Sequence, residues 1–393
     1  MATSTTGRGR TNLVQANREW ATRPADQRFW TLQDLYNKSK QYAEESVIKP
    51  LALNQCQVVP LVGDDLGLSG PKGGVATFQN YSFGQLCSLA KAPAGYLREL
   101  PAPVASACLN NGLERIEGEQ VLMFHQNGGL QLRCVTSPNY SRIWNYQIAE
   151  MALALEESEG WKTPPARPCG LDGIPTRVAT QADVLRKTAH PGLGIKVGDT
   201  ICPSGLYVSD HDCFIFQVNE DHPVDAGGGE FLHRGVFWSN SEVGDAKFRG
   251  TMFLYDTICG NHIVWSAKVI AEICLVHRGN AQEIFREAMA AATATIEKGA
   301  HEDQRRILAA KTFELAPTRD KVIDMVFKKD WGLSKSECDS AYVLATRHAE
   351  DHGTEPNTAW GYAAGVTRLS QGLHADKRVT MDRAAGRIME LAF

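Results

Sequence analysis

The sequence lacks the long apolar segments that membrane and secreted proteins carry. No run of about 18 or more apolar residues occurs among its 393 residues, so no transmembrane helix is expected. Its first ten residues, MATSTTGRGR, contain no apolar stretch of the kind that a secretory signal requires. With 43% hydrophobic and 22% charged residues, the chain can build a large core, in one domain or two. We expect a non-membrane protein of the cytoplasm.

Paired cysteines and phosphate-loop motifs are also missing. None of the ten cysteines belongs to a Cys-x-x-Cys pair, which argues against a zinc ribbon and a thioredoxin-type redox site. Reduced, mostly buried thiols are expected instead. Two glycine-rich segments, 67–74 and 192–198, lack the P-loop spacing that ends in Lys-Ser or Lys-Thr, so we interpret them as turns. The sequence therefore predicts no cofactor.

The chain has no excess of positive charge, with 41 Lys and Arg against 45 Asp and Glu. A formal net charge of −4 argues against a wholly basic nucleic-acid coat, because nonspecific DNA affinity comes mainly from neutralised phosphates. Residues 1–23 nevertheless carry four arginines against one acidic residue, which predicts a flexible basic arm over residues 1–30. By contrast, Leu206 to Asp245 contains eight acidic residues and one arginine. That local acidity weakens a simple phosphate-groove interpretation there.

Hydrophobic periodicity and turn residues predict an α+β fold. An antiparallel hairpin is expected where 121–124 and 130–135 flank His-Gln-Asn-Gly-Gly, because Asn and Gly tolerate positive φ. A strand at 58–62 is expected to precede a glycine-rich loop at 63–74. From Tyr207 onward, short apolar runs broken by Gly, Asn and Asp predict an antiparallel meander. Helices are predicted at 32–45, 83–90, 103–113 and 281–298.

This order of elements predicts an antiparallel sheet, composed of the hairpin and the meander, packed with helices. We divide the chain into the basic arm (1–30), an α+β core domain (31–300) and a mostly helical C-terminal region (301–393). A Pro/Gly-rich excursion near 160–176 interrupts the core domain.

The sequence also predicts one further helix and two connections between strands. Trp144, Ile148, Met151 and Leu155 recur at helical spacing, which predicts a helix opening near Ser141 with Trp144 in the core. The glycines at 227–229 and the turn at 239–244 are expected to connect antiparallel strands, with short polar side chains satisfying backbone groups.

Basic and aromatic residues interleave just after the predicted hairpin. Single strands are bound by base stacking on aromatic rings together with cations on the backbone, and this segment has both residue types. A second basic group lies on the meander, and one more arginine follows it. Taken singly, each group is better explained by chance surface charge. The candidate nucleic-acid-binding residues are Arg133, Tyr140, Arg142, Arg234, Lys247, Arg249 and Arg278.

Carboxylates in the acidic segment offer a different chemistry. Asp210 and Asp212 would share one face of a strand and, with Glu242, could hold Mg²⁺ through oxygen ligands for a metal-dependent nuclease. The favoured interpretation of Asp210 to Asp212 is a polar turn before a strand. No Gly-x-Ser-x-Gly elbow surrounds Ser239 or Ser241, so no catalytic signature stands out.

Several blocks of the chain resemble a known family. They are GGGEFLHRGVFWSNSEVGDAKFRGTMFLYDTICGNHIVW at 227–265, YSFGQLCSLAKAPAGYLRELPAPVASACLN at 81–110, VTSPNYSRIWN at 135–145, HRGNAQEIF at 277–285 and TAWGYAAGVTRLSQ at 358–371. In this order they resemble the phage/plasmid-like family of unknown function, which is encoded mostly by phages, prophages and plasmids. The resemblance implies a mobile-element protein, in the host cytoplasm if phage-encoded, and brings no chemistry with it.

The sequence and the resemblance together predict a phage-type protein that binds or anneals single-stranded DNA, as in recombination, and that forms a homo-oligomer. The alternatives are the Mg²⁺-dependent nuclease and a non-catalytic structural or host-interaction protein.

Overall fold

The structure is a computed structural model, and it describes only part of the chain. The described residues are 27–126, 128–158, 160–163, 167–168, 177–181, 196–202, 205–209, 211–227, 230–256, 262–263, 273–275, 281–298, 300–370, 373 and 375–393. Most of the predicted basic arm and most of the 160–176 excursion lie outside them, as do Asp210 and Arg278.

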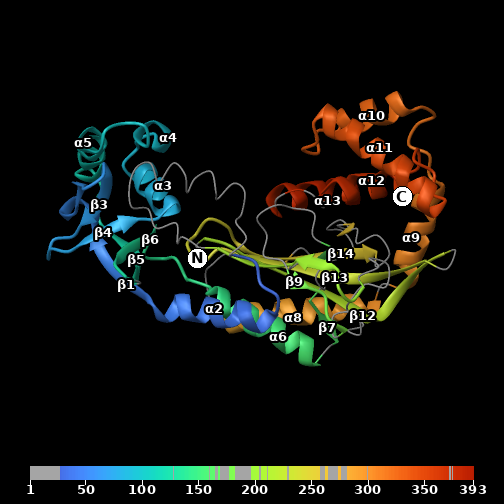
Figure 1. The fold of residues 1–393 in the computed structure, drawn as a ribbon, viewed down its shortest axis with the longest axis horizontal. Helices are drawn as coiled ribbons and strands as arrows, with labels where there is room; N and C mark the ends of the chain where they lie inside the picture. Colours follow the sequence, from blue (N-terminus) through green and yellow to red (C-terminus); the bar gives the residue numbers. More distant parts are fainter. Residues whose placement is uncertain are drawn as a thin grey trace.

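The described fold contains two large sheets, a small third sheet, helices packed on the large sheets and a C-terminal group of helices (Figure 1). The first sheet has six strands and the second has seven, and neighbouring strands are almost all antiparallel. Helices follow to the end of the chain. The predicted α+β class, rich in antiparallel strands and with a helical C-terminal region, is confirmed, but the hairpin and the meander belong to two different sheets and not to one.

The first sheet contains the predicted hairpin. Its strands are β1 (Ser46–Ala52), β2 (Gln57–Leu61), β3 (Asp65–Ser69), β4 (Val75–Phe78), β5 (Glu119–Gln126) and β6 (Leu130–Thr136), in the order β1-β5-β6-β4-β3-β2. Strands β5 and β6 form the antiparallel hairpin, and Gly128 in its turn has a φ of 64°. The interpretation of 63–74 as one loop was wrong, because Leu66 and Leu68 bury their side chains from β3 between two turns. Sequence reasoning also missed β1.

Three helices cover one face of this sheet: α3 (Asn80–Leu89), α4 (Ala94–Leu97) and α5 (Ala102–Leu113). Their apolar side chains form one core with the strands, including Phe78, Phe83 and Leu109. The side chain of Asn110 caps the edge strand β2, because it accepts from the amide of Val58 at 2.7 Å and donates to the Val58 carbonyl at 2.9 Å. An exposed edge strand is a hazard for pairing with other chains, and this cap occupies part of it.

The second sheet confirms the predicted meander. Its strands are β11 (Leu206–Val208), β12 (Cys213–Gly227), β13 (Glu230–Asn240), β14 (Phe248–Asp256), β15 (His262–Ile263), β16 (Ile273–Leu275) and β7 (Trp161–Lys162). A small third sheet contains β8 (Arg167–Pro168), β9 (Arg177–Val178) and β10 (Thr200–Cys202). Side chains alternate between two cores, as pleated strands require: Ile215 and Trp238 join one core, and Phe214 and Phe237 join the other.

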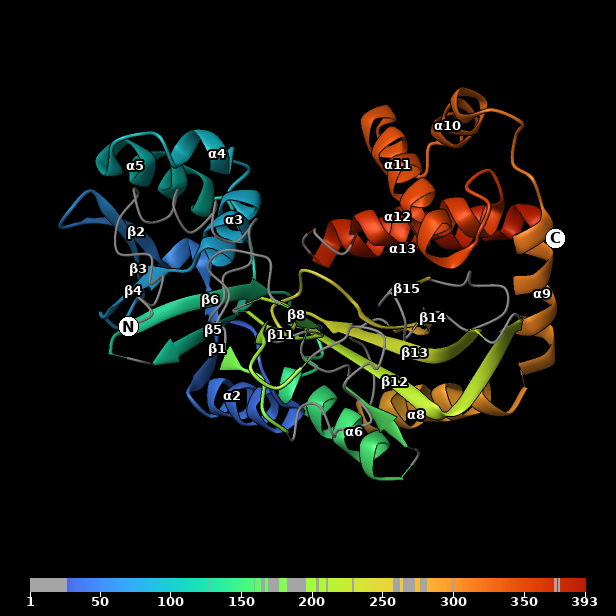
Figure 2. The same ribbon diagram turned by 45° about the vertical axis from the view of Figure 1, so that its right-hand side comes forward.

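Helices lie on both sides of the second sheet. In Figures 1 and 2, α2 (Leu32–Glu44), α6 (Asn145–Ser158) and α8 (Ala281–Lys298) lie below the sheet. Helix α6 begins at Asn145, later than expected. Ile148, Met151 and Leu155 are buried as predicted. Trp144 precedes the helix and is only half-buried, packed against a small cluster of Met123, Cys134 and Val243.

The C-terminal helices are α9 (Ala300–Thr312), α10 (Arg319–Phe327), α11 (Lys335–His352), α12 (Ala359–Ser370) and α13 (Ala375–Met389). In both views α9 runs along one end of the sheet, and the other four lie above the sheet. Helix α9 is anchored to the sheet by a buried ion pair between Arg234 and Asp303, whose N–O distance is 2.7 Å. Lys311 adds a hydrogen bond to the carbonyl of Ala226. Within the described ranges, no helix has the length and apolar character needed to cross a bilayer.

Candidate functional site

The two sheets meet where the chain leaves β6 and where β13 turns into β14. A buried ion pair joins these places: Nη2 of Arg133 lies 2.6 Å from Oε1 of Glu242, and both side chains are about fully buried at 2% and 1% exposure. The other carboxylate oxygen of Glu242 accepts from the amide of Asn145 at 3.0 Å. Since both of its oxygens are used, Glu242 fixes β6, the start of α6 and the β13–β14 turn together.

Tyr140 and Arg142 hold the same turn. The hydroxyl of Tyr140 donates to the carbonyl of Ser241 at 2.9 Å, and Arg142 donates to the carbonyl of Glu242. The Arg142 guanidinium lies 5.4 Å from the ring centre of Tyr140 and 5.5 Å from that of Trp144. The basic and aromatic side chains of this segment therefore stack on one another. We call Arg133, Tyr140, Arg142, Trp144 and Glu242 the junction cluster.

The turn at 239–244 is a strand connection, as predicted. Strand β13 ends at Asn240, whose side-chain amide donates to the carbonyl of Ile143 at 3.0 Å and to Oδ1 of Asn145 at 2.8 Å. The Ser241 hydroxyl accepts from the amide of Asp245 at 3.0 Å and is buried. The sequence block at 135–145 is thus hydrogen-bonded to part of the block at 227–265.

The predicted nucleic-acid-binding residues do not share one surface. Arg133 and Arg234 are buried and each is paired with a carboxylate, so this placement does not support them as phosphate contacts. Tyr140 and Arg142 are half-buried in the junction cluster. Lys247 is exposed between β13 and β14, and Arg249 is half-buried on β14. Arg278 lies outside the described residues.

The predicted metal ligands are engaged elsewhere or lie outside the described chain. Asp212 is buried and accepts from the hydroxyl of Ser209 at 2.5 Å, and the same hydroxyl lies 2.7 Å from Nδ1 of His211. This geometry matches the polar turn that was the favoured interpretation of 210–212. Glu242 is paired with Arg133. Among the described residues, no three His, Cys, Asp or Glu side chains form a group that could hold a metal ion.

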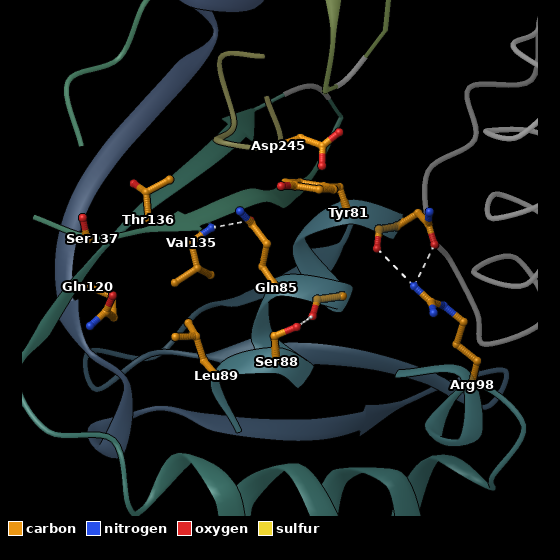
Figure 3. A pocket seen from close by; sticks show the side chains of 12 residues that line it. Tyr81, Gln85, Ser88, Leu89, Arg98, Gln120, Val135, Thr136, Ser137 and Asp245 are labelled. Carbon is orange, nitrogen blue, oxygen red and sulfur yellow. Dashed lines mark hydrogen bonds between the residues drawn. The ribbon is translucent and has the colours of Figure 1, made fainter. Parts of the chain in front are cut away.

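A pocket of about 620 Å³ opens beside the junction cluster, and we call it the α3 pocket. Helix α3 forms one wall, strands β5 and β6 supply others, and Asp245 reaches in from the β13–β14 turn (Figure 3). Gln85 ties these parts together, because it donates to the Val243 carbonyl at 3.0 Å and accepts from the Val135 amide at 2.9 Å. The lining residues are Asn80, Tyr81, Gly84, Gln85, Ser88, Leu89, Arg98, Gln120, Val135, Thr136, Ser137 and Asp245.

One end of the α3 pocket is aromatic. The Tyr81 ring stacks on the ring of His211, with 6.0 Å between ring centres and 23° between planes. Its hydroxyl is hydrogen-bonded to the Asp245 carboxylate. Burial, followed by the nearby charge of Asp245, raises the pKa of Tyr81 well above its usual value. The ring is thus held neutral and in a fixed orientation.

A cation also lines the pocket. Nη2 of Arg98 donates to the carbonyl of Asn80 at 3.3 Å and to its side-chain oxygen at 3.0 Å (Figure 3). The guanidinium lies 5.1 Å from the ring centre of Phe83. Burial lowers the pKa of Arg98, but an arginine pKa is so high that the group stays charged at neutral pH. Its Nε is buried and, among the described contacts, has no hydrogen-bond partner.

Sequence reasoning missed Tyr81, Arg98 and Asp245 as site residues. Asp245 lies more than 140 positions beyond Arg98 in the chain, and only the docking of the two sheets brings them to one pocket. The block at 81–110 did contain a signal, since a glycine inside the predicted helix asks for a packing or functional reason.

Comparisons of this chain with protein-family models, with curated proteins and with solved structures found no match, so the resemblance to the phage/plasmid-like family stays a prediction.

Proposed function

We propose that this protein binds single-stranded nucleic acid and that the strand passes over the α3 pocket. The observation that carries the proposal is that an aromatic ring, Tyr81, and a guanidinium, Arg98, line the same open pocket. Stacking of bases on aromatic rings contributes roughly 1–3 kcal/mol per base, and cations add attraction to the phosphates. Lys247, exposed two residues after Asp245, adds a cation near the rim.

The rest of the lining fits a polar ligand that contains hydrogen-bonding groups. Asn80, Ser88 and Gln120 present amide and hydroxyl groups to the pocket, while Leu89 and Val135 supply apolar surface. Nucleotides combine a flat ring, sugar hydroxyls or ether oxygens and a charged phosphate. In duplexes the ring faces are stacked and the ring edges paired, so a single strand is the form that this pocket accepts. Strand annealing and homo-oligomer formation stay predictions.

The test is a fluorescence-anisotropy titration with a labelled single-stranded oligonucleotide at low and at physiological salt. Salt-dependent binding is expected, because each neutralised phosphate contributes a slope of about −0.7 in log K against log salt. Arg98→Gln should weaken binding and make the slope shallower, whereas Arg319→Gln should change neither, because Arg319 lies on α10 and pairs with Asp339. Absent binding, or binding that ignores salt, would contradict the proposal.

A further inference from the structure

Gly84 occupies an unusual place in α3. A Cβ atom built on this glycine meets only Nη2 of Arg98, at 4.0 Å, so an alanine would fit without a clash. The helical glycines Gly112 and Gly365 differ, because their Cβ atoms would approach backbone oxygens to 2.4 Å and 2.2 Å. Packing therefore accounts for those two glycines and leaves Gly84 unexplained.

A glycine inside a helix has a cost in stability. Relative to alanine, glycine destabilises a helix interior by roughly 1 kcal/mol, since it loses more backbone entropy on folding. Gly84 also lines the α3 pocket, between Tyr81 and Ser88 on the same helix. Any side chain at position 84 would extend into the pocket near Arg98. Gly84 therefore leaves this wall of the pocket without a side chain, although glycine weakens the helix.

The flat wall lies between two groups that would recognise a nucleotide. Tyr81 is backed by His211 and held by Asp245, so it presents a fixed ring. Arg98 has a buried Nε without a partner among the described contacts, in addition to its charge. The pocket volume of about 620 Å³ leaves room for one base with its sugar and phosphate.

We propose that the α3 pocket holds one unpaired nucleotide, with its base against Tyr81, its phosphate at Arg98 and its sugar over Gly84. This inference rests on the proposed function, because it names the part of the strand that enters the site. The same chemistry is present in a free nucleoside monophosphate, so the experiment includes both ligands.

Two matched series at positions 84 and 81 test the proposal by oligonucleotide anisotropy, with thermal unfolding as a check on folding. Gly84→Ala should weaken binding slightly, because its methyl group enters the pocket near Arg98, whereas Gly84→Leu, which extends farther, should bind about tenfold or more weakly. Tyr81→Phe keeps the ring and should weaken binding less than Tyr81→Leu, which should lose about fivefold to a hundredfold, the equivalent of one stacked base. Deoxyadenosine monophosphate is titrated as a competitor with each protein.

The outcomes separate the two proposals. Competition by the free nucleotide that Gly84→Leu abolishes supports the pocket as a site for any such nucleotide. Strand binding lost in Gly84→Leu without such competition supports a site for a nucleotide within a strand. If the wild type binds strands in a salt-dependent way but folded Gly84→Leu and Tyr81→Leu bind equally well, the pocket assignment is overturned and the proposed function stands. If the folded wild type binds neither ligand, both are overturned.

Discussion

The junction cluster and the α3 pocket share the turn between β13 and β14, yet they differ in every physical respect that matters for binding. Glu242 points into the cluster, where a cation and a backbone amide satisfy both carboxylate oxygens. Asp245 reaches the pocket, which Tyr81 and Arg98 also line. The cluster has the basic and aromatic residues that suggest nucleic acid in the sequence, but these side chains stack on one another. The cluster thus connects the two sheets, whereas the pocket leaves a cavity of about 620 Å³ that a ligand could enter.

The largest expected effect comes from breaking the cluster. Arg133→Met leaves the Glu242 carboxylate buried without its cation, and such a change costs about 3–5 kcal/mol of unfolding free energy. Adding Glu242→Gln to Arg133→Met removes the unpaired charge and should recover part of the lost unfolding free energy. Denaturant unfolding of both single variants and the double variant measures this coupling. A loss below about 1 kcal/mol for Arg133→Met would show that the ion pair does not join the sheets.

Asp65 differs from Glu242, which is paired with Arg133, because the described residues include no ion pair to Asp65. Asp65 on β3 is buried, and burial raises its pKa from 3.8 to about 6, against the opposing hydrogen bond from the Leu66 amide. Because the folded pKa exceeds the unfolded one, this carboxyl favours folding below about pH 4 and that benefit is lost as pH rises through 6. Asp65→Asn should therefore stabilise the protein by about 3 kcal/mol at neutral pH.

The check is a series of unfolding curves from pH 4 to pH 7 for the wild type and Asp65→Asn. Their difference should be near zero at the acidic end and grow as the pH rises. A constant difference over this range would mean that the ionisation of Asp65 is not responsible.

Tyr140 gives a smaller test of the cluster. Tyr140→Phe removes the hydroxyl that donates to the Ser241 carbonyl and should lower stability by about 1 kcal/mol. Oligonucleotide affinity should stay the same, since the ring of Tyr140 is occupied by Arg142. If Tyr140→Phe melts normally but binds strands much more weakly, Tyr140 belongs to the binding surface and the prediction is wrong.

The smallest effect concerns the pocket and has the opposite sign. Gly84→Ala should raise the unfolding free energy by about 0.5–1 kcal/mol, because alanine is the better helix former and its Cβ has room. Gly112→Ala is the control and should destabilise, since its Cβ would collide with Ala90. Thermal unfolding of the two variants, side by side, measures the contrast.

Local patterns predicted much of the fold. The helix at 281–298 and the hairpin turn at Gly128 have strong short-range signals, namely alanine-rich helical spacing and an Asn-Gly-Gly turn. Strand β3 was missed because its short apolar run is surrounded by glycines, and Trp144 was misplaced because a helical spacing does not show where the helix begins.

The candidate site was less predictable than the fold. Arg133 and Glu242 are 109 positions apart, so nothing local shows that each satisfies the other. The same limit hid the pocket, whose ring, cation and carboxylate come from three separate segments. Residue type indicated the right chemistry near this junction, but only the packing of the two sheets decides which side chains remain open to a ligand.

Photocrosslinking tests the central claim most directly. A single-stranded oligonucleotide with iododeoxyuridine in place of thymidine is bound, irradiated and mapped by mass spectrometry, since a base in contact with an aromatic ring crosslinks to it. The account predicts that Tyr81 carries the crosslink and that Gly84→Leu abolishes it, while Tyr140 and Trp144 stay unmodified. A crosslink on Tyr140 or Trp144 with Tyr81 untouched would contradict the account, because the junction cluster and not the α3 pocket would then hold the strand.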